Sequence, residues 1–226
     1  MKSKWVQVSQ MDKISDTLIG AEALVKSRQR VANHGEVFTP SWMVEKMLDL
    51  VKDESERVDS RFLEPACGSG NFLLAVLRRK FTTIQSRFGQ NDFEKRHNAL
   101  FALMCIYGIE LLEDNITDCR NILLEELKEF LKIADDDLIL SAARHVLSSN
   151  IIQGDALTLR NNNGTPIHFP EWGYLGKGKY QRRDFKYDSL TLRSGSEGTL
   201  FEMFEEHELF APTKIYPQMN IEELAR

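Results

Sequence analysis

The sequence has few cysteines and no long apolar run. Its three cysteines, Cys67, Cys105 and Cys119, form neither an even disulfide set nor a C-x-x-C pair, which indicates reduced thiols and no metal site. No segment approaches the roughly 18 consecutive apolar residues of a membrane span, and Asp12 and Asp16 interrupt the region where a signal peptide would be apolar. We therefore expect a soluble, cytoplasmic protein that has no membrane partner.

A large excess of charge of either sign is also missing. The chain has 29 Lys and Arg against 34 Asp and Glu, a formal net charge of −5, with 42% hydrophobic and 28% charged residues. These values are typical of a globular protein and exclude a collagen-like or disordered chain. The length of 226 residues allows one core with appendages, since domains usually span roughly 100–200 residues. The mildly acidic total provides no global attraction to nucleic acid, so that ligand would need a local basic patch.

Strands and helices alternate through the middle of the chain. Short apolar segments over 61–66, 105–111 and 150–155 predict strands, and helical spacing predicts helices from Asn71 onward and over 98–104, 114–132 and part of 136–147. This alternation predicts an α/β fold with a parallel sheet of the doubly wound kind. A further helix is expected over 12–30, and the charged run over 52–59 is expected to be a solvated linker.

Both ends of the chain depart from this alternation. Pro40 is compatible with a first helical turn, and the apolar residues that follow, Trp42, Val44, Met47, Leu48 and Val51, predict one apolar helix face. Segments over 167–175 and 180–190, on either side of the turn Lys177-Gly178-Lys179, predict an antiparallel hairpin. The acidic remainder, over 193–226, is expected to hold a short helix near 201–208 and a loosely ordered tail.

The segment Cys67-Gly68-Ser69-Gly70 joins a predicted strand to a predicted helix. Glycines there let the chain turn tightly and bring the backbone close to a ligand, and the helix behind them presents unpaired N–H groups. Taken alone, this turn has the alternative interpretation of a tight connection with no ligand. However, Glu64, Glu110 and Asp155 lie at the ends of the three predicted strands, where open α/β sheets bind ligands. A carboxylate after the second strand is suited to the two hydroxyls of a ribose.

Four segments resemble motifs of the N6-adenine DNA methyltransferases of restriction-modification systems. Residues 64–72, E-P-A-C-G-S-G-N-F, resemble motif I, and residues 35–40, G-E-V-F-T-P, resemble the upstream F-x-T-P segment known as motif X. Residues 106–111 are similar to motif II and residues 150–157 to motif III, in the family's order. The resemblance implies a Rossmann-like fold that binds S-adenosylmethionine as its cofactor.

The resemblance also implies roles for particular residues. The F-T-P segment would wrap the methionine end of S-adenosylmethionine, Glu110 would hold the ribose, Leu111 would lie beside the adenine, and Asp155 would accept a hydrogen bond from the adenine amino group. The full set implied to bind the cofactor is Phe38, Thr39, Pro40, Glu64, Ala66, Gly68, Gly70, Asn71, Phe72, Glu110, Leu111, Asp155 and Ala156. The interval from Gly68 to Glu110 is about twice the roughly 20 positions of a dinucleotide fingerprint, which disfavours a nicotinamide enzyme.

The family's catalytic motif IV, a [DNS]-P-P-[YFW] tetrapeptide, has no counterpart in this sequence. No two of the six prolines are adjacent, so no catalytic residue is assigned. The alternation of strands and helices stops after the third predicted strand, whereas the resemblance implies a sheet with more strands. The fold is therefore expected to be truncated, with an open edge at the first strand that the hairpin or another chain covers.

A basic patch with interleaved aromatic residues lies in the predicted hairpin. Its cations are Lys177, Lys179, Arg182, Arg183 and Lys186, and its aromatic residues are Tyr174, Tyr180, Phe185 and Tyr187. Such a stretch can follow a phosphate backbone and stack bases, which makes the five cations candidate nucleic-acid-binding residues. The alternative is an ordinary hairpin whose aromatic side chains pack inward while alternate residues face solvent.

These observations lead to two main functional hypotheses. The first is an S-adenosylmethionine-binding subunit or half of a DNA adenine-N6 methyltransferase from a restriction-modification or related defence system. It would act on DNA directly or through another protein chain or a second copy that completes the sheet. The second is a non-catalytic methyltransferase-like regulator or structural component that binds the cofactor, a protein partner or both. A complete methyltransferase for another acceptor, acting through the hairpin, ranks third.

The expected organisation has three parts. Residues 1–58 form an N-terminal helical segment that carries the cofactor-closing F-T-P motif. Residues 59–158 form a partial Rossmann-like methyltransferase core, and residues 159–226 form the hairpin and the acidic tail.

Overall fold

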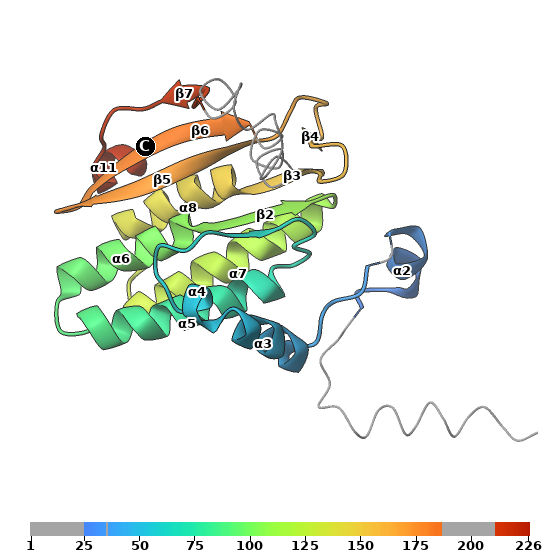
Figure 1. Ribbon diagram of the computed structural model, residues 1–226, viewed down its shortest axis with the longest axis horizontal. Coiled ribbons are helices and arrows are strands. Elements are labelled where there is room, and N and C mark those ends of the chain that lie inside the picture. The colour runs from blue at the N-terminus through green and yellow to red at the C-terminus, as the bar shows by residue number, and fades with distance from the viewer. Residues whose placement is uncertain (1–24, 35, 187–210) are drawn as a thin grey trace, which may run out of the picture.

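The computed structural model describes residues 25–34, 36–186 and 211–226 (Figure 1). Its helices are α2 (Arg28–His34), α3 (Ser41–Leu50), α4 (Lys52–Ser55), α5 (Asn71–Phe88), α6 (Asp92–Met104), α7 (Glu113–Leu131), α8 (Leu138–Asn150) and α11 (Ile221–Leu224). Its strands are β1 (Phe62–Glu64), β2 (Ile106–Glu110), β3 (Ile151–Asp155), β4 (Arg160–Asn161), β5 (His168–Gly176), β6 (Lys179–Lys186) and β7 (Lys214–Ile215). The predicted helix over 12–30 lies largely outside the described residues, and the one near 201–208 lies wholly outside them.

Three parallel strands form the centre of the fold. β1, β2 and β3 lie side by side in chain order, with Phe62 opposite Ile106 and Gly108 opposite Ile151, and the short β4 adds an antiparallel strand beside β3. α5 and α7 pack against one face of this sheet through the main apolar core. The structure therefore confirms the predicted α/β class with a parallel sheet. Because the strands are parallel, their carboxyl ends meet at one edge.

Local sequence explains how the strands and helices of this unit begin. Residues 106–109 of β2 are all buried, as expected for a parallel strand covered on both faces.

Asn91 caps α6 by accepting a hydrogen bond from the Glu94 backbone N–H at 3.1 Å, and Asp137 caps α8 by accepting one from the Ile139 backbone N–H at 2.9 Å. The first cap starts α6 at Asp92, six residues ahead of the helix predicted over 98–104.

α3 buries less of its apolar face than the sequence predicted. Val44 and Leu48 are buried, and α3 packs on α5. Trp42 and Met47, which were predicted on the same face, are 54% and 46% exposed. The reason is that α3 lies at the edge of the molecule and contacts one neighbouring long helix among the described elements.

The charged run over 52–59 is more ordered than the predicted linker. α4 forms within it, and the buried Lys80 of α5 donates hydrogen bonds to the carbonyls of Arg57 (2.6 Å), Val58 (3.1 Å) and Ser60 (2.6 Å). Burial lowers the pKa of Lys80 to about 8, yet the three carbonyls match the three donors of an ammonium group. These contacts fix the chain directly ahead of β1.

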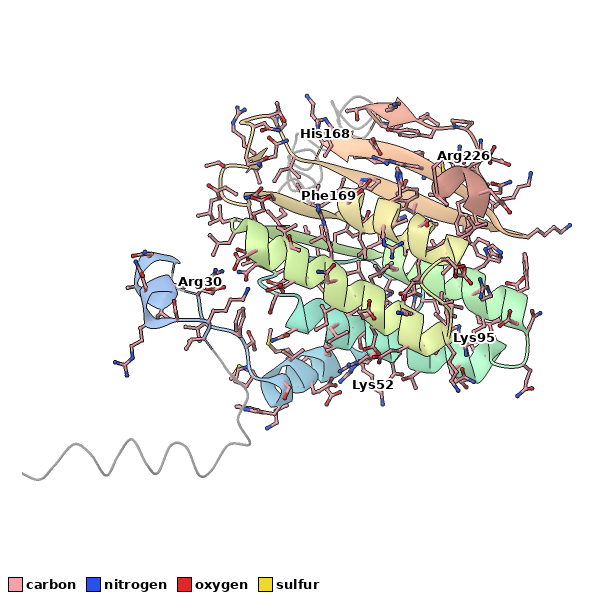
Figure 2. The ribbon with its side chains drawn as sticks, turned by 180° about the vertical axis from the view of Figure 1, so that it is seen from behind. Arg30, Lys52, Lys95, His168, Phe169 and Arg226 are labelled. Atoms are coloured by element: carbon pink, nitrogen blue, oxygen red, sulfur yellow. The ribbon has the colours of Figure 1, made fainter. Side chains whose placement is uncertain are left out.

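The predicted hairpin is confirmed and forms a second sheet. β5 pairs antiparallel with β6, and β7 adds to the other side of β6. The start of β5 covers the face of the parallel sheet opposite α5 and α7, where Phe169 packs with Tyr107 and Ile109 (Figure 2). The Tyr107 hydroxyl donates a hydrogen bond to the Pro170 carbonyl at 2.8 Å.

Polar contacts join the second sheet to α6 and α8. The indole N–H of Trp172 donates to Asn150 Oδ1 at 2.9 Å, and the Tyr180 hydroxyl lies 2.6 Å from His97 Nδ1. The hairpin thus packs on these helices and on one face of the parallel sheet. It does not pair with β1, which remains an edge strand among the described residues.

Residues 211–226 are ordered, which corrects the prediction of a loose tail. β7 pairs with β6, and α11 packs on α8 with Leu224 buried. Asn220 and Glu223 form a capping box that starts α11. The prediction relied on net acidity, whereas a few apolar residues are enough to dock the segment. None of the helices in the described ranges combines the length and the apolar character that a bilayer crossing requires.

Candidate cofactor-binding site

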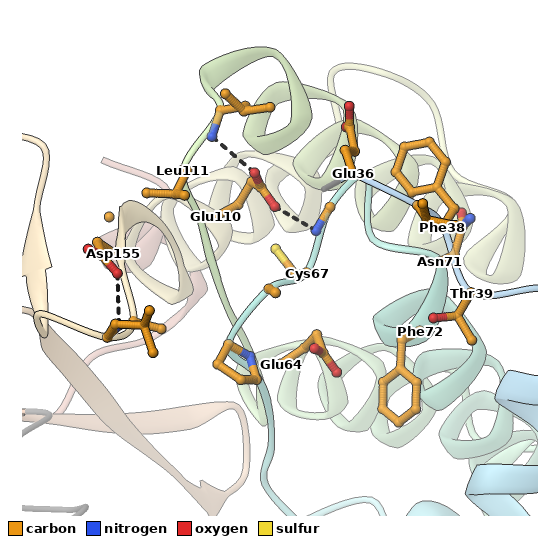
Figure 3. Close-up of a pocket in the computed structure, with 18 of the residues that line it drawn as sticks. Glu36, Phe38, Thr39, Glu64, Cys67, Asn71, Phe72, Glu110, Leu111 and Asp155 are labelled. Atoms are coloured by element: carbon orange, nitrogen blue, oxygen red, sulfur yellow. Dashed lines mark hydrogen bonds between the residues drawn. The ribbon is translucent and has the colours of Figure 1, made fainter. Parts of the chain in front are cut away.

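A cavity of about 540 Å³ opens at the carboxyl edge of the parallel sheet (Figure 3). The ends of β1, β2 and β3 contribute to its wall, together with the turn after β1, the start of α5 and residues 36–39 ahead of α3. This is the edge at which open α/β sheets bind their ligands.

The glycine turn after β1 has a backbone conformation that other residues rarely adopt. Gly68 has φ +51° and Gly70 has φ +94°. A Cβ atom on Gly70 would lie 2.7 Å from Cys119 Sγ, and one on Gly68 would lie 3.2 Å from the Phe38 ring. α5 begins directly after Gly70, so the turn brings the positive end of that helix to the cavity wall.

Glu110, at the end of β2, ties this turn to the start of α7. Its Oε2 accepts a hydrogen bond from the Gly68 N–H at 2.9 Å, and its Oε1 accepts one from the Leu112 N–H at 3.0 Å (Figure 3). Each carboxylate oxygen keeps a second lone pair that can accept from a ligand hydroxyl. The sequence pointed to a ligand role for Glu110, but it did not show that the same carboxylate holds the turn.

Four carboxylates line the cavity. They belong to Glu36, Glu64, Glu110 and Asp155, and no Lys, Arg or His is found among the described residues that line it. Asp155 Oδ1 accepts from the Leu157 N–H at 2.8 Å. Burial raises the pKa of Glu64, as expected for a carboxyl group partly withdrawn from water. A wall of this kind favours a cationic ligand over a phosphate.

Most of the predicted cofactor residues meet in this cavity. Its lining contains every residue of the predicted set except Pro40 and Gly70. Pro40 lies at the N-cap of α3, and Gly70 faces Cys119 behind the wall. That this set binds a cofactor stays a prediction, but the structure brings the residues of four separate segments together.

Some lining residues were missed by the sequence reasoning. Glu36 and Val37 directly precede the F-T-P segment and could have been predicted with it. Met47 and Leu157 reach the cavity through the packing of α3 and the path of the chain after β3, for which the sequence offers no local signal.

Cys67 lines the cavity but is not activated as a nucleophile. The adjacent Cys119 thiol and burial both raise the pKa of Cys67 far above its usual value. A Cβ atom on Gly108 would lie 2.8 Å from Cys67 Sγ, so the thiol fills space beside β2. This arrangement agrees with the packing role that a small side chain in the turn suggests.

The five cations of the predicted nucleic-acid patch do not share one face of the hairpin. Arg182 pairs with Asp184, with 2.6 Å between Nε and Oδ1, while Arg183 points to the other face and pairs with Glu171. The three lysines of the patch are exposed, and none of the five cations lines the cavity. A nucleic-acid role stays a prediction, and the lysines suit it better than Arg182.

The fold and the cavity define an α/β protein with an acidic cavity at the carboxyl edge of its parallel sheet, where open α/β sheets bind ligands. A family model described as N-6 DNA Methylase matches residues 21–144, more than half of the chain. The chain therefore belongs to the N-6 DNA methylase family. No curated protein and no solved structure matches it. The family match includes β1, β2 and the glycine turn, whereas Asp155 lies beyond it.

Proposed function

We propose that this chain binds S-adenosylmethionine in the cavity and serves as the methyl-donor half of a DNA adenine-N6 methyltransferase. The observation that carries the proposal is the lining, which holds four carboxylates and, among its described residues, no basic side chain. S-adenosylmethionine has a nucleoside, a sulfonium cation and an ammonium group, and no phosphate. Nucleotide cofactors such as NADH carry phosphates, which these carboxylates would repel.

The lining offers a partner for each part of that cofactor. Glu110 has lone pairs available for the ribose hydroxyls, and Asp155 lies at the next strand end, where the adenine would lie. Glu64 is placed to pair with the ammonium group, and the first turn of α5 is suited to the carboxylate. Bound there, the cofactor would supply an electrophilic methyl group, and this chain's residues would orient it and exclude water.

The acceptor site is proposed to come from outside residues 1–226. The sequence contains no [DNS]-P-P-[YFW] tetrapeptide, and β1 is an edge strand in the described part of the structure. We propose that a second protein chain, or a second copy, supplies the acceptor site and contacts DNA within a restriction-modification or related defence system. The absence of the tetrapeptide also favours a second candidate, a non-catalytic methyltransferase-like regulator.

A methyl-transfer assay separates the two candidates. The chain is incubated with methyl-labelled S-adenosylmethionine and adenine-containing duplex DNA, alone and with a co-encoded protein that carries the tetrapeptide. The donor-half proposal predicts no transfer by the chain alone and transfer in the mixture, lost again when the partner's tetrapeptide is changed. Transfer by the chain alone would place the acceptor site within these residues, and a mixture that is inactive despite cofactor binding would support the regulator.

A further inference from the structure

Residues 25–34 and 36–39, here called the strap, approach the cavity with little apolar anchoring. Glu36, Val37, Phe38 and Thr39 contribute to the cavity lining. None of the described side chains of the strap belongs to the buried core, and Val25 and Val37 are 40% and 60% exposed. Apolar burial therefore does not explain why the strap lies against the cavity.

Charge pairs connect the strap to the first turns of α7. Lys26 Nζ lies 2.6 Å from Asp118 Oδ2 and 3.3 Å from Asp114 Oδ2. Arg30 Nη1, on α2 (Figure 2), lies 2.6 Å from Asp114 Oδ2. Hydrogen bonding to Arg30 lowers the pKa of Asp114 to about 2, which shows how strongly the pair favours the ionised carboxylate. The strap is thus held mainly by contacts between opposite charges.

Glu36 links this charge cluster to the cavity. Its side chain is only 9% exposed, and both of its carboxylate oxygens accept from Arg30, one of them at 2.9 Å from Nη2. It also accepts from Asn115 Nδ2 of α7 at 2.7 Å. Since Glu36 lines the cavity and Arg30 does not, Arg30 acts on the cavity wall through Glu36.

We infer that Arg30 is a positioning residue that holds the strap against α7 and so closes the cavity over its ligand. The inference rests on the proposed function, because it takes the cavity as the cofactor site. The pairs with Asp114 and Asp118, whose side chains are 52% exposed, weaken as salt screens them, whereas apolar contacts do not weaken in this way. Closure of the cavity, and with it retention of the ligand, therefore depends on ionic strength.

The test uses S-adenosylhomocysteine, which lacks the sulfonium cation and has an ammonium and a carboxylate group of opposite charge, so that its net charge is zero. Any salt dependence of these ligand charges is common to the wild type and the variants. Its affinity for the full chain is measured by calorimetry at about 50 mM and about 500 mM sodium chloride, a range over which the Debye length shortens severalfold. For the wild type we expect affinity to fall about threefold to tenfold at high salt, in keeping with a few exposed charge pairs. Arg30→Met and Glu36→Gln should bind more weakly than the wild type already at low salt, and Arg30→Met should lose less affinity as salt is added, because only the Lys26 charge pairs remain.

Arg78→Met is the matched control. Arg78 of α5 pairs with Glu126 of α7, with 2.8 Å between Nη2 and Oε2. Like Arg30, it is an arginine paired with an acid of α7, but neither Arg78 nor Glu126 lines the cavity. This variant should keep the affinity and the salt dependence of the wild type. The inference is overturned if Arg30→Met also keeps both.

A second measurement, made without ligand, tests the role of Arg30 independently of the proposed function. Hydrogen–deuterium exchange of the α2 amides should be slow in the wild type at low salt, and fast both at high salt and in Arg30→Met. A wild-type chain that binds no ligand would overturn the proposed function. Equal exchange of α2 in the wild type and in Arg30→Met at low salt would overturn the role of Arg30.

Discussion

Glu110→Gln is expected to weaken S-adenosylmethionine binding about tenfold to a hundredfold. Two hydrogen bonds from ribose hydroxyls to a carboxylate contribute about 1.5–3 kcal/mol each, and about 1.4 kcal/mol corresponds to a tenfold change in affinity. Glutamine keeps the shape of the side chain but replaces one acceptor oxygen with an amide nitrogen that donates.

The same substitution also disturbs the protein itself. The carboxylate accepts from the backbone N–H groups of Gly68 and Leu112, one on each oxygen. In glutamine, the amide nitrogen must face one of these two donors, so a backbone N–H near the cavity loses its acceptor. We expect about 1–3 kcal/mol of lost stability from that group, which will appear in urea unfolding as a lower midpoint.

Glu113→Gln is the control for this experiment. Glu113 is an exposed acid in the first turn of α7, three positions from Glu110, and does not line the cavity. Calorimetric titration of both variants should show loss of binding in Glu110→Gln alone. An affinity of Glu110→Gln within about threefold of the wild type would contradict the assignment of the ribose site.

Gly68→Leu is expected to abolish detectable cofactor binding while the chain stays folded. A Cβ atom at this position would already lie 3.2 Å from the Phe38 ring, and a leucine side chain must displace that ring or enter the cavity. The left-handed backbone at φ +51° adds a cost of about 1–2 kcal/mol for a residue other than glycine.

Gly164→Leu separates the backbone strain from the steric block. Gly164 has φ +77°, but no atom lies within 4 Å of a Cβ built on it, and it does not line the cavity. Both variants should lose similar stability in thermal unfolding, and only Gly68→Leu should lose binding. If Gly68→Leu binds as tightly as Gly164→Leu, the cavity beside Phe38 is not the cofactor site.

The strand ends were predictable from sequence because parallel strands impose a simple rule. Each of β1, β2 and β3 ends with an acid, and parallel pairing brings all three acids to one edge. The apolar run over 106–109 identified β2, since such a run fits a strand buried on both faces.

Contacts between distant segments were not predictable. The hydrogen bond from Asn115 to Glu36 joins residues 79 positions apart, and no local pattern in either segment announces it. Arg182 shows the opposite case, because its partner Asp184 lies two residues along the same strand and therefore on the same face. That pairing could have been predicted, and it gives the Arg182 guanidinium a carboxylate partner within the protein.

The start of α6 and the packing of the C-terminal residues could not be predicted for a different reason. Asn91 is a good cap, but it stands in a polar stretch where other residues could also begin a helix. The docking of α11 depends on a few apolar residues, among them the buried Leu224, in an acidic segment whose net charge suggested solvent exposure.

Calorimetric titration of S-adenosylmethionine into the 226-residue chain, with NADH as the comparison ligand, tests the central claim most directly. The acidic lining without a described basic side chain predicts binding of S-adenosylmethionine in the micromolar range and no heat of binding with NADH. Binding of NADH, or no binding of S-adenosylmethionine, would contradict the claim that this cavity is a methyl-donor site.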